Sequence, residues 1–211
     1  MRLLFGLGAA LLVFVSMGAL AVEPREDLDY VLNSPHPALP DKDRIEVIEF
    51  FYYGCGACNR FEPLLQSWLA TLAPDVAFRR VPALRRTAWV PLARIFFALD
   101  QLGQLERLHA QVYRAVHAEG LDLGNTSDLY EWAERFGLDR SRLLNALESD
   151  ALSVQVQRAR DTTIAYAVRA TPSFAVDGKY LTSVNLTGSP EALLPTVDSL
   201  LGKARRSRAA Q

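Results

Sequence analysis

The stretch from Ile45 to Cys58 reads IEVIEFFYYGCGAC, and the interpretation of the whole chain starts from it. Residues 45–53 are rich in β-branched and aromatic side chains and are almost continuously apolar, which predicts a buried β-strand. Gly54 interrupts that pattern, and from Asn59 to Leu72 the apolar residues recur at helical spacing. The two cysteines therefore lie where a buried strand gives way to a helix.

This position favours redox chemistry at Cys55. The first N–H groups of a helix have no partners within it, and the helix dipole adds partial positive charge, so a thiolate there is stabilised. A lowered pKa makes Cys55 a nucleophile in thiol–disulfide exchange, and Cys58, one turn later, is expected to be more buried and to close the bond. A passive disulfide across so short a loop would stabilise little, and a metal site would need about four ligands. We therefore predict a redox disulfide of Cys55 and Cys58, with no metal and no cofactor.

The composition narrows the class of protein. The chain has 211 residues, of which 50% are hydrophobic and 22% charged, and its net charge is −1. These values are typical of one globular domain, or of one domain with an insertion, and they exclude general disorder and a multi-span membrane protein. The near-zero net charge argues against nucleic acid as the main partner.

The N-terminal residues 1–21 are typical of a secretory signal peptide. Arg2 is followed by an uncharged stretch from Leu3 to Val22, which contains the small-x-small pattern Ala19-Leu20-Ala21. We expect cleavage after Ala21 and export to the periplasm, where disulfides persist. The alternative is an uncleaved membrane anchor, because the apolar run approaches the roughly 20 residues that span a bilayer.

The remaining elements define the predicted fold class. A second strand is expected at residues 76–81, helices from about 86 to 157, a strand pair around Asp177-Gly178, and a last helix from Pro190 to Leu201. This order predicts an α/β fold, an α+β sandwich with the thioredoxin topology and an inserted all-helical domain. We assign residues 22–85 and 158–211 to the thioredoxin-like domain and residues 86–157 to the helical insertion.

Two further features are candidates for the site. Glu49 lies six residues before Cys55 in the buried strand, where desolvation would raise its pKa and let it exchange a proton with the Cys58 sulfur. The alternative is a strand whose glutamates reach solvent, as we expect for Glu46. Pro172 opens a strand, and a cis bond after Thr171 would expose the Thr171 backbone beside the cysteines, although an ordinary trans proline fits the sequence equally well.

The segments Val47–Cys58 and Val168–Phe174, with Asp177–Tyr180, resemble the DsbA family of periplasmic thiol:disulfide oxidoreductases. The resemblance covers essentially the whole chain after residue 21. It implies that Cys55 forms the mixed disulfide with substrate and that Cys58 resolves it. It also implies that Pro172 is cis and faces the cysteines, that Thr171 touches substrate, and that Glu49 is the acidic residue of the site.

The same resemblance implies partners and a direction of electron flow. The partners are reduced substrate proteins and a quinone-linked membrane reoxidase of the DsbB type, and we expect the chain to act as a monomer. Well-known members have Pro-His between the cysteines, whereas this chain has Gly56-Ala57, so we expect a less oxidising disulfide. A second departure is Ala170, which stands where the family usually has glycine.

Three functions remain open from the sequence. The first is an exported enzyme that oxidises substrate cysteines with its own disulfide. The second is a reductase or isomerase with the same site. The third is a peptide-binding, chaperone-like module in which the two cysteines are only a structural clip.

Charged residues elsewhere are interpreted as solvated. His109 and His117 lie in predicted helices without cysteines or acid clusters nearby, so we expect exposed imidazoles rather than ligands. Arg79 and Arg80 are expected to form a solvated rim near a strand end.

Overall fold

The computed structural model describes residues 23–33 and 43–210, so the expected signal segment, with its cleavage after Ala21, lies outside the described residues. The first half of the fold holds β1 (Val31–Leu32), β2 (Ile45–Phe51), α1 (Gly56–Leu69) and β3 (Val76–Pro82). The helical part holds η1 (Thr87–Trp89), α2 (Val90–Gln101), α3 (Leu105–His117), α4 (Thr126–Arg135), α5 (Arg140–Glu148) and α6 (Asp150–Ala165). The last part holds β4 (Ser173–Val176), β5 (Tyr180–Ser183), α7 (Val184–Thr187) and α8 (Pro190–Ala209).

The strands form one sheet in the order β1-β5-β4-β2-β3. β2 is parallel to β3 and antiparallel to β4, and β4 is antiparallel to β5. The β4–β5 turn has positive φ at Asp177 and Gly178, as the Asp-Gly pair predicts. This confirms the expected thioredoxin-like fold with a helical insertion. The short elements β1 and α7 were not predicted from the sequence.

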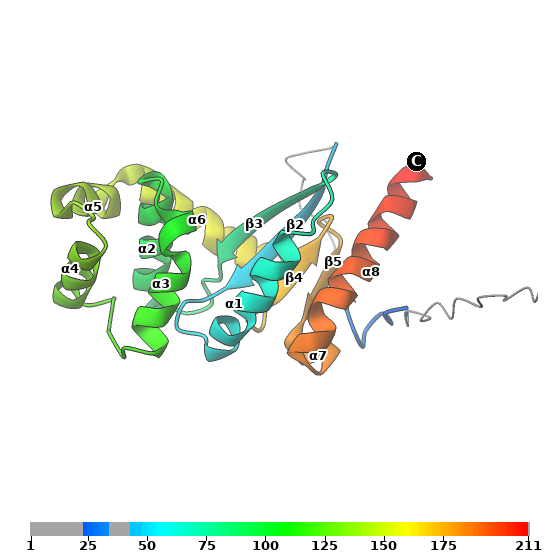
Figure 1. Cartoon of the computed structure of the whole chain (residues 1–211). Coiled ribbons are helices and arrows are strands. Elements are labelled where there is room, and N and C mark those ends of the chain that lie inside the picture. Colours follow the sequence, from blue (N-terminus) through cyan, green and yellow to red (C-terminus); the bar gives the residue numbers. More distant parts are fainter. Residues whose placement is uncertain (1–22, 34–42, 211) are drawn as a thin grey trace, which may run out of the picture.

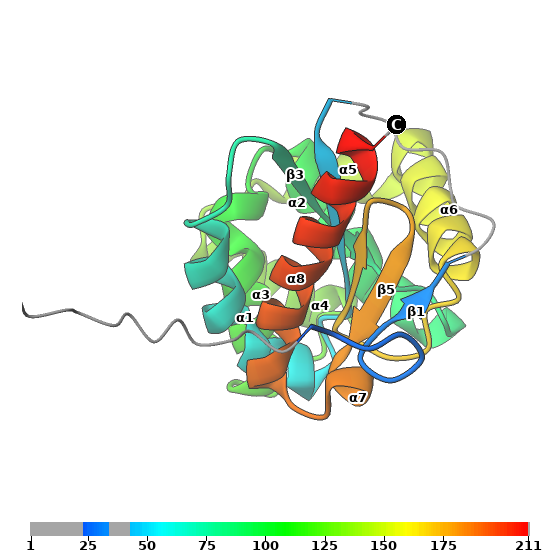
Figure 2. The same ribbon diagram turned by 90° about the vertical axis from the view of Figure 1, so that its right-hand side faces the viewer.

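The two faces of the sheet are covered by different helices. Along β2, Ile45 and Val47 pack with residues of α1 and α8, whereas Ile48 and Phe50 pack with residues of α2 and α6. Figure 1 shows α1 and α8 on one face, and the turned view in Figure 2 shows α6 on the other. Both faces of β2 are therefore buried, which explains its nearly continuous apolar sequence.

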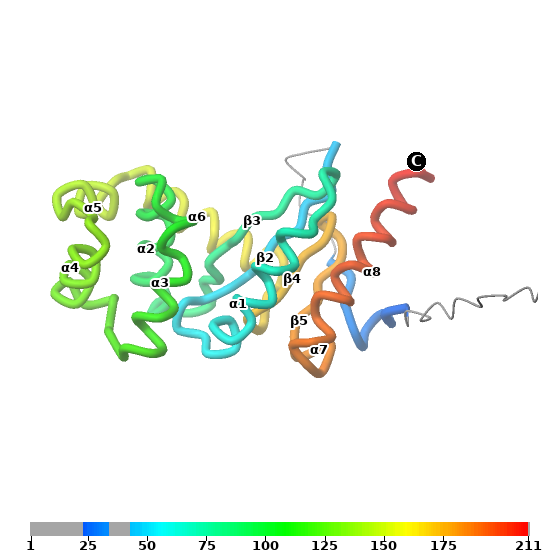
Figure 3. The backbone as a smooth tube through the Cα atoms, viewed as in Figure 1, coloured from blue at the N-terminus to red at the C-terminus, as the bar shows by residue number. Residues whose placement is uncertain are grey.

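Helices α2 to α5 gather at one end of the molecule, beyond β3, as the backbone trace in Figure 3 shows. Their core includes Phe51 and Tyr53, so the chain that leaves β2 is held by the helical part as well as by the sheet. The expected boundary at residue 157 falls inside α6, which runs from the helical part back to the sheet. Within residues 23–33 and 43–210, no helix is long and apolar enough to span a membrane.

Candidate active site

Cys55 is the residue that begins α1. β2 ends at Phe51, two residues earlier than the sequence predicts, and the Cys55 N–H donates to the Tyr52 carbonyl at 2.9 Å. The helix starts at Gly56, three residues before the predicted start, so Cys55 takes the N-cap position. Its Sγ accepts a hydrogen bond from the Cys58 N–H at 3.3 Å. The sulfur therefore lies where unpaired backbone donors of the helix can stabilise negative charge.

The surroundings of Cys55 lower its pKa to about 5. The largest cause is a hydrogen bond with the Cys58 thiol, and burial opposes it; the Thr171 side chain and the backbone N–H groups of Cys58 and Ala57 lower the pKa further. At neutral pH, Cys55 is consequently a thiolate, which is the nucleophilic form. The side chain is only partly buried, so it remains within reach of a substrate.

Cys58 is the opposite kind of cysteine. It is 1% exposed and packs in the core of the helical part. Burial, and then the neighbouring Cys55, raise the pKa of its thiol far above the ordinary value. The pair therefore combines an accessible thiolate with a buried thiol that keeps its proton.

The Thr171–Pro172 segment lies against this pair. β4 pairs antiparallel with β2, with Ser173 opposite Phe50. The residues before Ser173 therefore lie beside the end of β2 that leads to Cys55. The peptide bond between Thr171 and Pro172 is cis. The Cys55 Sγ is 3.3 Å from the Thr171 carbonyl oxygen, to which Cys55 donates when its thiol is protonated. The structure thus brings together four predicted site residues: Cys55, Cys58, Thr171 and Pro172.

Glu49 is buried at 1% exposure, in the strand that leads to the cysteines. Desolvation raises the pKa of its carboxyl to about 8, and the nearby Arg80 opposes this shift. The negative charges of Glu49 and Cys55 also raise the pKa of Cys58, so the carboxyl is electrostatically coupled to the buried thiol. A carboxyl that titrates near neutral pH beside a reacting group is suited to proton transfer.

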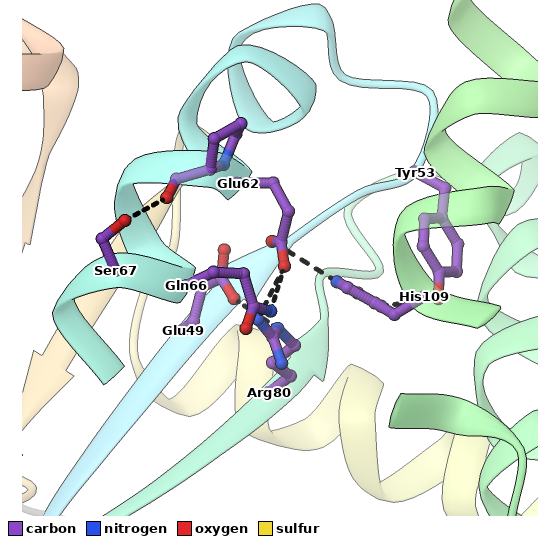
Figure 4. Close-up of polar contacts among 8 residues, drawn as sticks. Glu49, Tyr53, Glu62, Gln66, Ser67, Arg80 and His109 are labelled. Atoms are coloured by element: carbon purple, nitrogen blue, oxygen red, sulfur yellow. Dashed lines mark hydrogen bonds and ion pairs between the residues drawn. The ribbon is translucent and has the colours of Figure 1, made fainter. Parts of the chain in front are cut away.

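Glu49 belongs to a buried charge cluster that the sequence analysis did not find (Figure 4). We use the term buried charge cluster for Glu49, Arg80, Glu62 and His109. Arg80 lies beside Glu49 in the β2–β3 register; its Nε donates to Glu49 Oε2 at 3.0 Å, and its Nη2 donates to Glu62 Oε1 at 2.9 Å. Glu62 Oε2 faces His109 Nε2 at 3.5 Å.

Three expectations about solvated charges are wrong. Arg80 has a side chain only 9% exposed, because it reaches from β3 to Glu49 on β2 and to Glu62 on α1. His109 is 3% exposed and His117 is half-buried, since α3 turns both toward the loop that carries Tyr53. Glu46 is also buried, and Arg79 donates to it at 2.7 Å, because α6 covers that face of β2.

One of the missed residues carries a sequence signal. Glu62 follows Cys58 by four residues, between the apolar Phe61 and Leu65, so it lies on the helix face that carries the buried cysteine. A charged residue on an apolar face needs a partner, and this one has Arg80. The described residues contain no group of three or more His, Cys, Asp or Glu side chains that could hold a metal ion.

Relatives of known activity match most of the chain. The family described as "DSBA-like thioredoxin domain" matches residues 74–193. "Thiol:disulfide interchange protein DsbA" of Bordetella parapertussis is 34% identical over 202 residues, which are 95% of this chain and 96% of that protein. The protein of the same name in Pseudomonas aeruginosa is 33% identical over 190 residues, which are 90% of each chain.

Solved structures of the same family superpose on most of this chain. The crystal structure of Pseudomonas aeruginosa DsbA superposes with a TM-score of 0.84 at 31% identity and covers 89% of this chain and 97% of that chain. The oxidoreductase NmDsbA3 from Neisseria meningitidis superposes with a TM-score of 0.75 at 27% identity, over 88% of this chain and 100% of that chain. The chain therefore belongs to the DsbA family of thiol:disulfide interchange proteins.

Proposed function

We propose that this protein is an oxidase of substrate cysteines in the periplasm and that Cys55, Cys58 and Glu49 are its catalytic residues. The observation that carries the proposal is the asymmetry of the cysteine pair. Cys55 is partly exposed with a pKa of about 5, and Cys58 is buried and keeps its proton. A dithiol whose reduced form is stabilised in this way has an oxidising disulfide.

The reaction begins from the Cys55–Cys58 disulfide. A substrate thiolate attacks the Cys55 Sγ, a bond forms between the two sulfurs, and Cys58 leaves as a thiolate that takes the proton of the neutral Glu49 carboxyl. A second substrate thiolate then attacks the substrate sulfur of the mixed disulfide, and Cys55 leaves as a stabilised thiolate. The substrate has lost two electrons and gained a disulfide, and the enzyme pair has been reduced.

Thr171 and Pro172 are proposed to hold the substrate. The Thr171 carbonyl lies just before the start of β4, 3.3 Å from the Cys55 sulfur. An extended peptide that pairs with the Thr171 backbone would present its own cysteine to Cys55. We propose the division into a thioredoxin-like domain of residues 22–85 and 158–211 and a helical insertion of residues 86–157, with α6 continuous across the second boundary.

Reoxidation of the cysteine pair needs an electron acceptor. We propose a quinone-linked membrane protein of the DsbB type, which would take two electrons from Cys55 and Cys58. The proposal also includes a monomeric enzyme, a signal peptide cleaved after Ala21, and no nucleic-acid partner.

The direction of the reaction is tested by the redox state of the pair in cells, trapped with a thiol-reactive mass tag. An oxidase is expected to be mostly oxidised, and a mostly reduced pair would identify a reductase or isomerase. A Cys55→Ser variant addresses the chaperone-like alternative. It should lose the oxidation of a reduced test protein; unchanged activity would show that the cysteines are only a structural clip.

A further inference from the structure

The buried charge cluster has an unbalanced charge if both of its carboxyls are ionised and its histidine is neutral. Arg80 then supplies one positive charge against the two negative charges of Glu49 and Glu62. The side chains are 2% exposed at Glu49, 9% at Arg80, 7% at Glu62 and 4% at His109. A net charge enclosed this completely is costly, so the cluster is most stable when it holds one extra proton.

Glu62 does not hold that proton. Its Oε1 accepts hydrogen bonds from Arg80 and from Gln66, the latter at 2.6 Å. Burial opposes its ionisation, but the neighbouring His109, the charge of Arg80 and the hydrogen bond from Gln66 outweigh burial and hold the pKa of this carboxyl below its ordinary value. The proton therefore has two remaining positions, the carboxyl of Glu49 and the imidazole of His109.

The surroundings of His109 suit both the neutral and the charged imidazole. Its Nδ1 lies 2.8 Å from the Tyr53 hydroxyl, which can donate to a bare nitrogen or accept from a protonated one. Its Nε2 faces Glu62 Oε2, and neither of these atoms has another partner among the described residues. Figure 4 shows the imidazole between Tyr53 and Glu62, with Arg80 and Glu49 beyond the carboxylate.

Groups on every side of His109 affect whether its imidazole is neutral or charged. Burial, the largest cause, and Arg80 on β3 disfavour the charged form, whereas Glu62 on α1 and Glu106 on α3 favour it, and together they lower the pKa of His109 below its ordinary value. The remaining neighbours are rings, and burial keeps the hydroxyls of Tyr53 and Tyr113 neutral.

We propose that His109 is a positioning residue that shares a single proton with Glu49 across Arg80 and Glu62. When His109 holds the proton, Glu62 pairs with the imidazolium, and Arg80 is free to pair with Glu49 alone. Glu49 is then an ionised carboxylate. That carboxylate is the base that takes the proton from Cys58 when Cys58 attacks a mixed disulfide. This last step rests on the proposed function, whereas the sharing of the proton does not.

The sharing is tested by NMR on the reduced protein, with the His109 imidazole nitrogens and the Glu49 carboxyl carbon followed from pH 4 to 9. Both groups are expected to shift in the same two pH steps, as coupled groups do. In Glu49→Gln, His109 is expected to show one step at lower pH, because the charge that favoured the imidazolium is gone. A His109 that stays neutral throughout, or that titrates identically in both proteins, would overturn the proposal. His117 in the same spectra is the control and should not change.

The consequence for catalysis is tested by the pH profile of His109→Gln. We expect release of glutathione from the Cys55 mixed disulfide, trapped by quenched flow, to slow by about tenfold at pH 6.5, less than the loss of a whole general base. The rate should approach that of the wild type above pH 9, where Glu49 ionises without help. An equal loss at every pH would indicate a merely structural role, and His117→Gln is the matched control. Because release from a preformed mixed disulfide does not depend on the direction of the reaction in cells, failure of the oxidase proposal would leave this result interpretable.

Discussion

The two ends of β2 carry the same charge pair in different surroundings. At its amino end, Glu46 receives a hydrogen bond from Arg79 at 2.7 Å, and at its carboxyl end Glu49 receives one from Arg80 at 3.0 Å. Arg79 is 43% exposed, so water shares its charge, whereas Arg80 is 9% exposed and is divided between two carboxyls. Burial of the Glu49 carboxyl raises its pKa to about 8, and Arg80, which Glu49 shares with Glu62, opposes this shift only in part.

The largest difference is expected when each arginine is removed. Arg80→Ala leaves two buried carboxyls without their shared partner and should lower the free energy of unfolding by about 3–5 kcal/mol. Arg79→Ala should cost only about 1–2 kcal/mol, because water can replace a partner that is half exposed. Urea unfolding of both variants measures the two losses in the free energy of unfolding and so their ratio. Equal losses would mean that the two ends of the strand do not differ in the way we describe.

Removal of each carboxyl should separate catalysis from structure. Glu49→Gln is expected to slow the oxidation of a reduced peptide by roughly tenfold at neutral pH, because Cys58 loses its proton partner while water replaces part of that assistance. Glu46→Gln lies on the α6 side of the sheet and should leave the rate nearly unchanged. Stopped-flow fluorescence with both variants provides the comparison, and a similar loss in both would remove Glu49 from the mechanism.

Glu49 should also couple the stability of the fold to pH. Burial raises the pKa of Glu49 from 4.5 to about 8, so the folded state binds its proton more tightly than the unfolded state. This contribution to stability is complete below about pH 4.5 and is lost as the pH rises to about 8. In the oxidised protein, Glu49→Gln should therefore reduce the loss of stability between these values. Thermal unfolding across this range measures the slope, and an unchanged slope in Glu49→Gln would contradict the assignment.

An effect no larger than that of Glu49→Gln is expected from a change that acts on the exposed sulfur alone. Ala57→His places an imidazole near the helix N-terminus, where its positive form would stabilise the Cys55 thiolate further. The reduction potential should rise by about 30 mV, a tenfold change in the exchange equilibrium. Equilibration with glutathione measures this value, and a potential that stays the same or falls would show that the residues between the cysteines do not tune the pair.

The sequence was sufficient for the parts of the site that are local along the chain. The strand, the glycine and the helix around Cys55 predicted the position of the nucleophile, and the buried strand predicted a perturbed Glu49. Arg80 and His109 could not be predicted in the same way, because each is an ordinary charged residue in its own segment. Only the β2–β3 register and the packing of α3 against α1 bring them to Glu49 and Glu62.

The elements of the fold were likewise predictable only where the sequence pattern is long enough. The long periodic segments predicted the sheet and the helices, although the boundaries of β2 and α1 moved by two or three residues. β1 has only two residues and forms by pairing with β5, so its local sequence carries little strand signal. α7 is a single helical turn that ends at Gly188, which has positive φ, and so short a segment lacks a helical period.

The ionisation of Cys55 is the most direct test of the proposed asymmetry of the two cysteines. In the reduced protein, the absorbance of the thiolate near 240 nm can be followed as the pH is raised, with Cys55→Ser as the blank. We expect one transition at about pH 5, with Cys58 silent through the neutral range. A first transition only near the free-cysteine value of about 8.5 would contradict it.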